Sequence, residues 1–295
     1  MLITTRLLSV VLLILPVLLQ AAPKFDVHLH YKWNQQEITS PQDVIVVLDA
    51  NEIEYAAIIG TPAELVQELR KQNPERILAW YGPYREHGDW YQWHQDKTLP
   101  ERARKALTSG DYIGVGELHL VGGFSPTPTS EVITGLLRLS AETQTPMLIH
   151  VEFGRADYLI ELCRIEPDAH LLLAHAGAPL RPREVRRALE ACPNLWWELS
   201  ARDPLRYTGS PIVDEDGVLK PKWKALILDY SDRLMLGADA VWPVEQLNPW
   251  DEPDSGWQHL GEFWEGHEQW LSQLPDDVRQ KIEYLNAVIF FGIPG

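Results

Sequence analysis

Short apolar runs alternate with amphipathic segments along most of this chain, and this alternation constrains the fold more than any other feature. Eight apolar runs have the length of β-strands and lie at residues 24–30, 55–60, 76–82, 112–120, 146–152, 170–177, 195–200 and 233–239. Five segments between them have helical periodicity and lie at residues 62–72, 99–110, 130–144, 155–166 and 181–192. Strands that are so continuously apolar are typical of a parallel sheet with helices on both faces.

Eight strand–helix units in roughly 270 residues predict an α/β fold, a (β/α)8 TIM barrel, as a single domain over residues 23–295. An open, doubly wound sheet is the alternative, but no GxGxxG motif follows the first strand, where a dinucleotide-binding fold needs one. Two connections, at residues 83–98 and 201–232, are long. In a barrel both would rise from the catalytic face, where long loops shape substrate binding.

The N-terminal segment differs from the rest of the chain. After Arg6, a run of 13 residues from Leu7 to Leu19 is apolar except for Ser9. At about 1.5 Å per residue this run is short for a bilayer about 30 Å thick, and it matches the hydrophobic region of a secretory signal. We therefore expect residues 1–22 to be a signal peptide, or an anchor if uncleaved, and the protein to be exported to the periplasm or secreted. A buried N-terminal helix is the alternative.

The formal net charge of −16 becomes −17 if residues 1–22 are removed, because Arg6 is their only charged residue. This acidic balance argues against nucleic acid as the main partner, since affinity for it comes from neutralising phosphates. A metal site can still supply local positive charge, so the exclusion is incomplete. We expect a small-molecule substrate, a membrane contact only through an uncleaved N-terminal segment, and leave a homo-oligomer open.

The two cysteines, Cys163 and Cys192, lie in helical segments that follow different strands. Export would permit a disulfide between them. Their spacing does not match a thiolate metal site. We expect two unlinked structural cysteines.

Polar residues close several of the apolar strands, all at the carboxyl end. They are His28 and His30 on the first strand, Glu117 on the fourth, His150 on the fifth, His175 on the sixth and Asp239 on the eighth. In a barrel these ends converge on one mouth. Imidazole and carboxylate are the ligands of Zn²⁺ and related divalent ions in open catalytic sites. The pattern therefore predicts a metal site, whereas any one of these residues alone is more typical of a structural role.

The fourth strand raises a question of its own. Alternation along a strand places Ile113, Val115, Glu117 and His119 on one face. A buried charge without a partner costs several kcal/mol. Glu117 therefore needs a partner, and a metal site at the end of the strand would provide one.

The motifs FDVHLH, GVGELHL, MLIHVE, LLLAHAG and RLMLGAD resemble, in this order, the strand motifs of the metal-dependent hydrolases of the amidohydrolase superfamily. The resemblance is strongest to the amidohydrolase-related branch, which includes decarboxylases, lactonases and hydrolases of carboxylic-acid derivatives. The segment YLNAVIFFG resembles the NA-x-x-x-F-G segment that usually closes those domains, so the resemblance spans about residues 25–292. It implies that His28, His30, His150 and Asp239 bind metal and that Asp239 also takes the proton from metal-bound water. His175 would be a ligand or would polarise the substrate.

One strand departs from that branch, in which many members have no carboxylate on the fourth strand. GVGELHL is more similar to the GEIGLD strand of the TatD-type hydrolases, whose glutamate bridges two metals. The resemblance therefore implies one or two divalent ions, with Zn²⁺ expected, and Glu117 as a ligand of the second. His119 matches no ligand position and is expected to contact a metal ligand or face the substrate, with a purely structural role as the alternative.

The resemblance implies that a metal-bound hydroxide hydrolyses a small-molecule lactone, ester or amide. A TatD-like phosphodiesterase or nuclease, and a decarboxylase that uses the same metal site, are the enzymatic alternatives. A catalytically idle barrel that binds a metal or a ligand is the alternative outside enzymes, since a fold does not guarantee activity.

Candidate substrate contacts lie just beyond the strand ends. Trp33 follows the first metal motif, and Trp90 and Trp93 lie in the first long connection, where they would wall a pocket or pack the loop onto the barrel. Arg85 and Arg155 would bind a substrate carboxylate or form surface ion pairs.

Overall fold

The structure is a computed structural model that describes residues 23–86, 89–121, 126–203, 206, 211–243 and 252–293. The predicted signal segment, residues 1–22, lies outside the described residues. One parallel sheet contains eight strands in the order of the sequence. They are β1 (Lys24–Lys32), β2 (Ile53–Thr61), β3 (Ile77–Tyr81), β4 (Gly114–Leu120), β5 (Met147–Val151), β6 (Leu171–Leu173), β7 (Leu195–Glu198) and β8 (Leu234–Met235).

Hydrogen bonds between β1 and the residues that follow β8 close the sheet into a ring. The amide of Val27 donates to the carbonyl oxygen of Leu236 at 2.9 Å, and the amide of Asp239 donates to that of His28 at 2.6 Å. Sequential strand order together with this closure confirms the predicted (β/α)8 barrel and excludes the open, doubly wound sheet.

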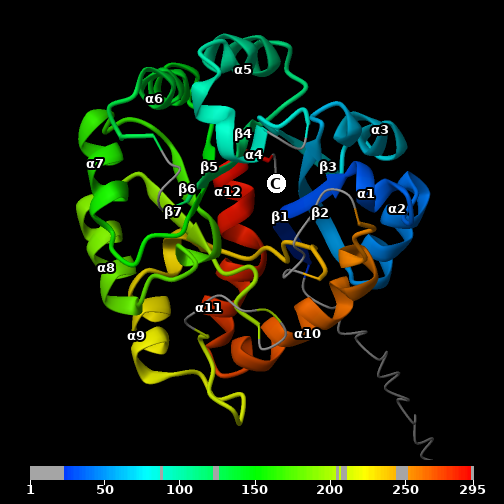
Figure 1. Ribbon diagram of the computed structural model, residues 1–295. Helices are drawn as coiled ribbons and strands as arrows, with labels where there is room; N and C mark the ends of the chain where they lie inside the picture. Colours follow the sequence, from blue (N-terminus) through cyan, green and yellow to red (C-terminus); the bar gives the residue numbers. More distant parts are fainter. Residues whose placement is uncertain are drawn as a thin grey trace, which may run out of the picture.

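Helices surround the strands, and the last helix lies in the middle of the view in Figure 1. The helices are α1 (Trp33–Gln36), α2 (Pro41–Ala50), α3 (Leu65–Gln72), α4 (Asp89–Gln92), α5 (Leu99–Thr108), α6 (Glu131–Thr143), α7 (Asp157–Ile165), α8 (Pro182–Ala191), α9 (Pro221–Asp229), α10 (Leu260–Leu271), α11 (Asp276–Gln280) and α12 (Asn286–Phe291). Each of the five helices predicted from the sequence overlaps one of these observed helices. The second long connection is a loop only in part, because α9 occupies residues 221–229 and buries Trp223, Leu226 and Ile227.

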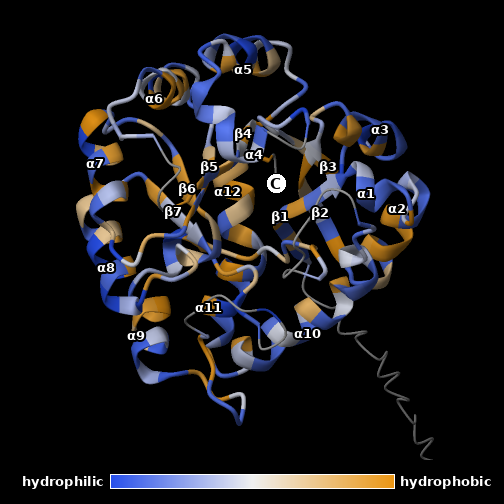
Figure 2. Ribbon diagram, viewed as in Figure 1, coloured by the Kyte–Doolittle hydropathy of each residue, from blue (hydrophilic) through white to orange (hydrophobic). Residues whose placement is uncertain are grey.

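Two apolar clusters hold the barrel together. The larger one lies between the strands and the helices and includes Leu29, Val115 and Leu118. The smaller one contains Phe25 and Trp80, and α12 contributes Ala287 to it. In Figure 2 the strands and α12 are rich in hydrophobic residues, while the surrounding helices carry both kinds, as expected for helices with one buried face.

The alternation of side chains breaks in β4, so the prediction that Ile113, Val115, Glu117 and His119 share one face is wrong. The pairing register of β4 with β5 shifts between Val115 and Leu118. Val115 belongs to the larger apolar cluster, whereas Ile113 packs against the smaller one. Such an irregularity redirects the side chains that follow it, and here it turns Glu117 and His119 together toward the mouth of the barrel.

A disulfide joins Cys163, in α7, to Cys192, directly after α8. The expectation of two unlinked cysteines is therefore wrong. Consecutive helices of a (β/α)8 barrel lie next to each other even though different strands precede them, and the two Cα atoms are 5.8 Å apart. That separation is within the range that a disulfide spans.

Within the part of the chain that the structure describes, no helix is both long enough and apolar enough to span a membrane.

Candidate metal centre

The polar residues that close the strands converge at one end of the barrel. His28 and His30 come from β1, Glu117 from β4 and His150 from β5, while His175 lies two residues after β6 and Asp239 four residues after β8. Most of these side chains are deeply buried; Glu117 is 3% exposed and Asp239, near the opening, is 15% exposed. The structure thus brings together all six residues that the sequence predicts as metal ligands.

Glu117 lies at the centre of this group, and its two oxygens face different histidines. The Oε2 atom is 3.4 Å from Nε2 of His28 and 3.3 Å from Nε2 of His30. The Oε1 atom is 3.0 Å from Nδ1 of His150 and 3.3 Å from Nε2 of His175. Glu117 therefore belongs to two sets of candidate ligands at once, one on each side of its carboxylate.

Asp239, in the segment that follows β8, faces some of the same histidine nitrogens. Its Oδ1 is 3.4 Å from Nε2 of His30, and its Oδ2 is 3.9 Å from Nε2 of His175. The backbone of both His175 and Asp239 has a positive φ, 55° and 46° respectively. Such conformations cost energy in non-glycine residues and cluster at functional sites. The guanidinium of Arg206 donates to the carbonyl oxygen of Asp239 and helps to hold it there.

These distances suit a shared cation. Two ligand atoms bound tetrahedrally to Zn²⁺ at about 2.1 Å lie about 3.4 Å apart. The carboxylate oxygens of Glu117 lie 3.0 to 3.4 Å from the facing nitrogens of four histidines. Imidazole nitrogens mixed with carboxylate oxygens are also the donor set that Zn²⁺ and related ions prefer. The residues present therefore fit a divalent metal.

The electrostatics of the group favour ionised carboxylates. Burial acts to raise the pKa of Glu117, but electrostatic interactions with His119 and His28 and the hydrogen bonds from His150 and His175 hold it well below its ordinary value. Burial acts on Asp239 in the same way, and nearby histidines, with His28 first, again lower its pKa. A cation bound between these side chains would take over the compensation that the imidazoles provide.

His119 has surroundings unlike those of the other histidines. Its Nδ1 is 2.8 Å from the hydroxyl oxygen of Tyr84, which also accepts a hydrogen bond from the His119 amide at 3.0 Å. Its Nε2 is 3.5 Å from Oε2 of Glu117. Trp93 donates to the carbonyl oxygen of His119, and the ring of Trp90 lies 5.5 Å from the imidazole. The first long connection therefore packs against the site through His119.

The remaining predicted substrate residues lie outside this group. Trp33 is the first residue of α1 and is partly buried against the larger apolar cluster. The side chain of Arg85 is 55% exposed and pairs with Asp89. That of Arg155 is 75% exposed and pairs with Asp157 at 2.7 Å. These contacts match the surface ion pairs that the sequence left open for both arginines.

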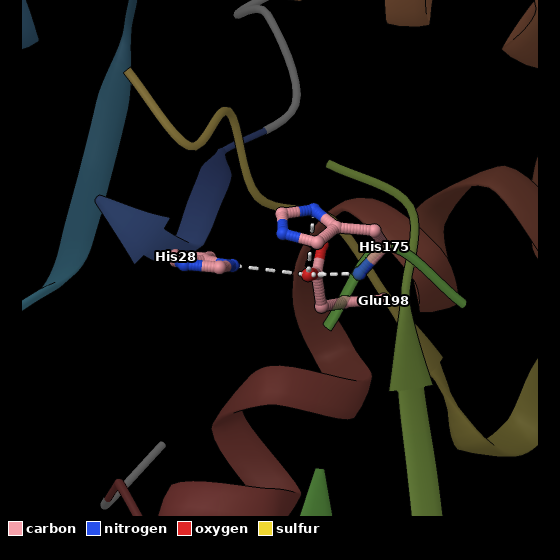
Figure 3. A group of neighbouring side chains, drawn as sticks. All are labelled: His28, His175 and Glu198. Atoms are coloured by element: carbon pink, nitrogen blue, oxygen red, sulfur yellow. Dashed lines mark hydrogen bonds and ion pairs between the residues drawn. The ribbon is translucent and has the colours of Figure 1, made fainter. Parts of the chain in front are cut away.

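Sequence reasoning missed Glu198, a fully buried carboxylate at the end of β7. Its Oε1 lies 3.1 Å from Nδ1 of His28 and accepts a hydrogen bond from the amide of His175 at 2.7 Å (Figure 3). A signal was present in the sequence. In the run LWWELS the residues before Glu198 are apolar, and β7 ends at this carboxylate, as other strands end near their polar residues. Ser200 follows, with its hydroxyl 2.8 Å from Nδ1 of His175.

Comparison with known proteins places these observations in a family. The model of a family described as amidohydrolase matches residues 25–293. No curated protein matches the chain.

Solved structures share the fold at low identity. A TatD homologue from Escherichia coli K12 is 17% identical with a TM-score of 0.61, and the match covers 92% of this chain and 98% of that one. An amidohydrolase from Burkholderia multivorans with bound HEPES is 15% identical with a TM-score of 0.55, covering 92% and 100%. An amidohydrolase from Burkholderia multivorans with bound zinc is 17% identical with a TM-score of 0.51 and the same coverage. Identities this low support the fold alone.

Proposed function

We propose that this chain, which belongs to the amidohydrolase family and is a metal-dependent hydrolase, hydrolyses a small-molecule lactone, ester or amide. The observation that carries the proposal is the arrangement around Glu117. Two sets of candidate ligands share this one carboxylate: His28 and His30 on one side, and His150 and His175 on the other.

We assign the metal ligands as two groups. His28, His30 and Asp239 with Oε2 of Glu117 would hold one ion, and His150 and His175 with Oε1 of Glu117 would hold a second. Zn²⁺ is the ion that the histidine and carboxylate donors favour, and one of the similar structures contains zinc. A divalent ion held by these residues would lower the pKa of bound water toward about 7 and would polarise a substrate oxygen.

Asp239 is the residue to which we assign proton transfer. Its carboxylate lies nearer the opening than that of Glu117, and its lowered pKa keeps it ionised and able to accept a proton. It would take a proton from the attacking water and give it to the leaving group, which is general base and then general acid catalysis. His175, which we assign to the second ion, has its Nε2 3.9 Å from Oδ2 of Asp239.

We assign His119 to the substrate rather than to the metal. If the Tyr84 hydroxyl donates to Nδ1, the ring proton of a neutral His119 is on Nε2, which points toward Glu117. A nitrogen that carries a proton cannot bind metal, but it can donate to a substrate oxygen. The nearby rings of Trp90 and Trp93 would give this side of the site an aromatic wall.

A TatD-like phosphodiesterase is the second candidate, and the shared Glu117 favours it. Two ions bridged by a carboxylate suit in-line displacement at phosphorus as well as attack on a carbonyl carbon. Against a nuclease stands the net charge of −16, which repels a polyanion. A small substrate is therefore the better fit.

We also propose that the protein is exported to the periplasm or secreted. The disulfide between Cys163 and Cys192 supports this proposal, since disulfides persist in oxidising compartments. Residues 1–22 would be the signal peptide or an uncleaved anchor, and the latter would be the protein's contact with a membrane.

Activity on a panel of lactones, esters, amides and phosphodiesters tests the proposed reaction. We expect turnover of a carboxylic-acid derivative that a chelator removes and added Zn²⁺ restores. Asp239→Asn should lower kcat by about 10²-fold or more, because it removes the proton acceptor. Glu283→Gln, which changes a buried carboxylate far along the chain on the segment Lys281–Leu285, is the control and should leave turnover unchanged. Cleavage of phosphodiesters alone would overturn the substrate class.

A further inference from the structure

Glu198 accepts hydrogen bonds from the ends of three strands although no part of it is exposed. Its Oε1 accepts from the amide of His175 at 2.7 Å, and its Oε2 accepts from the amide of Ser200 at 2.5 Å. Both oxygens are thus acceptors of backbone N–H groups. The Nδ1 atom of His28 is a third neighbour, 3.1 Å from Oε1, as Figure 3 shows.

The partner of His28 determines which of its ring nitrogens carries a proton. A carboxylate oxygen that faces Nδ1 can only accept, so Nδ1 must be protonated. The opposite nitrogen, Nε2, points to Oε2 of Glu117 at 3.4 Å and to Nε2 of His30 at 3.2 Å. Glu198 therefore leaves Nε2 as the nitrogen of His28 whose lone pair can bind a metal when the ring is neutral.

Ser200 fixes the protonation of the His175 ring in the same way, with the proton on Nδ1. The Nδ1 atom of His175 is 3.2 Å from the carbonyl oxygen of Ser200, which can only accept, so this Nδ1 is protonated as well. Nδ1 is also 2.8 Å from the hydroxyl oxygen of Ser200, and that oxygen is 2.8 Å from Oε1 of Glu198. The hydroxyl accepts from the imidazole and donates to Glu198. The Nε2 atom of His175 is left facing Oε1 of Glu117 at 3.3 Å.

We propose that Glu198 and Ser200 are positioning residues that fix His28 and His175 with Nδ1 protonated and Nε2 aimed at the metal. This inference rests on the proposed function, because it assigns a role toward the metals bound there. One buried carboxylate would then orient one ligand from each side of Glu117, His28 for one ion and His175 for the other. Hydrogen bonds of this kind to ligand histidines raise metal affinity.

Zn²⁺ affinity, measured by competition with a chromogenic chelator, tests the proposal without any substrate. Glu198→Gln places an amide N–H₂ against at least one of the donors that face Glu198, so we expect affinity to fall about 10- to 100-fold. Ser200→Ala should weaken binding less, because the Ser200 carbonyl still holds His175, and Ser200→Thr should restore it. Glu283→Gln and Ser140→Ala are matched controls, since each changes a buried polar side chain whose partners are not candidate ligands.

A structural role alone would lower thermal stability in all of these variants and leave Zn²⁺ affinity unchanged. The ¹⁵N NMR spectrum of the zinc-loaded protein provides a second readout, in which Nδ1 of His28 and His175 should be protonated. Wild-type affinity in Glu198→Gln, or Nε2 protonation of these two rings, would overturn the proposal. If the wild-type protein itself bound no Zn²⁺, the proposed function would fail instead.

Discussion

Glu117 is a buried carboxylate in an otherwise apolar strand, and its surroundings explain how it is tolerated. Four imidazole nitrogens lie within 3.4 Å of its two oxygens, from His28, His30, His150 and His175. Burial acts to raise the pKa of Glu117, but electrostatic interactions with His119 and His28 and hydrogen bonds from His150 and His175 outweigh it. Each oxygen of Glu117 faces a different pair of histidines. The presence of Glu117 therefore decides whether the site has ligands for two ions or for one.

His119 gives a prediction at the same scale. His119→Phe removes a donor near the reacting centre, so kcat/KM should fall by about 10²-fold, as for other single donors to developing charge. Tyr84→Phe should have a smaller effect in the same direction, because it removes the hydroxyl that faces Nδ1. Metal content, measured on the same samples, should stay at the wild-type value in both variants. Loss of one ion in His119→Phe would show that this histidine is a ligand.

Strand ends carry most of what the sequence revealed about the site. The eight apolar runs and their closing polar residues were sufficient to predict the barrel and to bring six residues to its mouth. Alternation alone was insufficient in β4, because the register shift after Val115 depends on how β4 pairs with β5. Glu198 was missed although it ends β7 in the same way, because its partner is the far nitrogen of His28, which only the packed barrel brings near.

Close approach of β8 to β1 gives a prediction for these elements. A Cβ atom added at Gly237 would lie 2.6 Å from Cβ of His28, so Gly237→Ala must push the two strands apart. Overpacking of this kind costs about 1–3 kcal/mol. We expect a lower free energy of unfolding in denaturant titrations together with weaker Zn²⁺ binding. Gly154→Ala is the control, because nothing lies within 4 Å of its added Cβ, and an equal loss in both variants would argue against this explanation.

The disulfide between α7 and α8 gives a second prediction at this scale. Closing a loop with a sequence separation of 29 should stabilise the protein by about 3.6 kcal/mol through the unfolded chain. Replacing both Cys163 and Cys192 by Ser should therefore lower the free energy of unfolding by about that amount while leaving metal content unchanged. Thiol titration of the unfolded wild-type protein under oxidising conditions should find no free cysteine, and two reactive thiols would contradict the bond.

In the molecule as a whole, the apolar cluster that stabilises the barrel and the polar residues of the candidate metal site lie at opposite ends of the barrel. One end is filled by the smaller apolar cluster, to which α12 contributes, and the other end carries the histidines and carboxylates. Apolar periodicity predicts the first end from the sequence because burial of apolar surface drives it. The pairing of individual polar atoms at the mouth depends on differences in distance of a few tenths of an ångström, which the sequence pattern does not encode.

Metal content of the purified protein, measured after loading with Zn²⁺ and removal of unbound ions, tests the central claim most directly. We predict about two equivalents in the wild-type protein, and at most one in Glu117→Ala, because that substitution removes the ligand that both groups share. Glu283→Gln should retain the wild-type value. A wild-type protein that holds no Zn²⁺, or a Glu117→Ala variant that keeps the full wild-type content, would contradict the account.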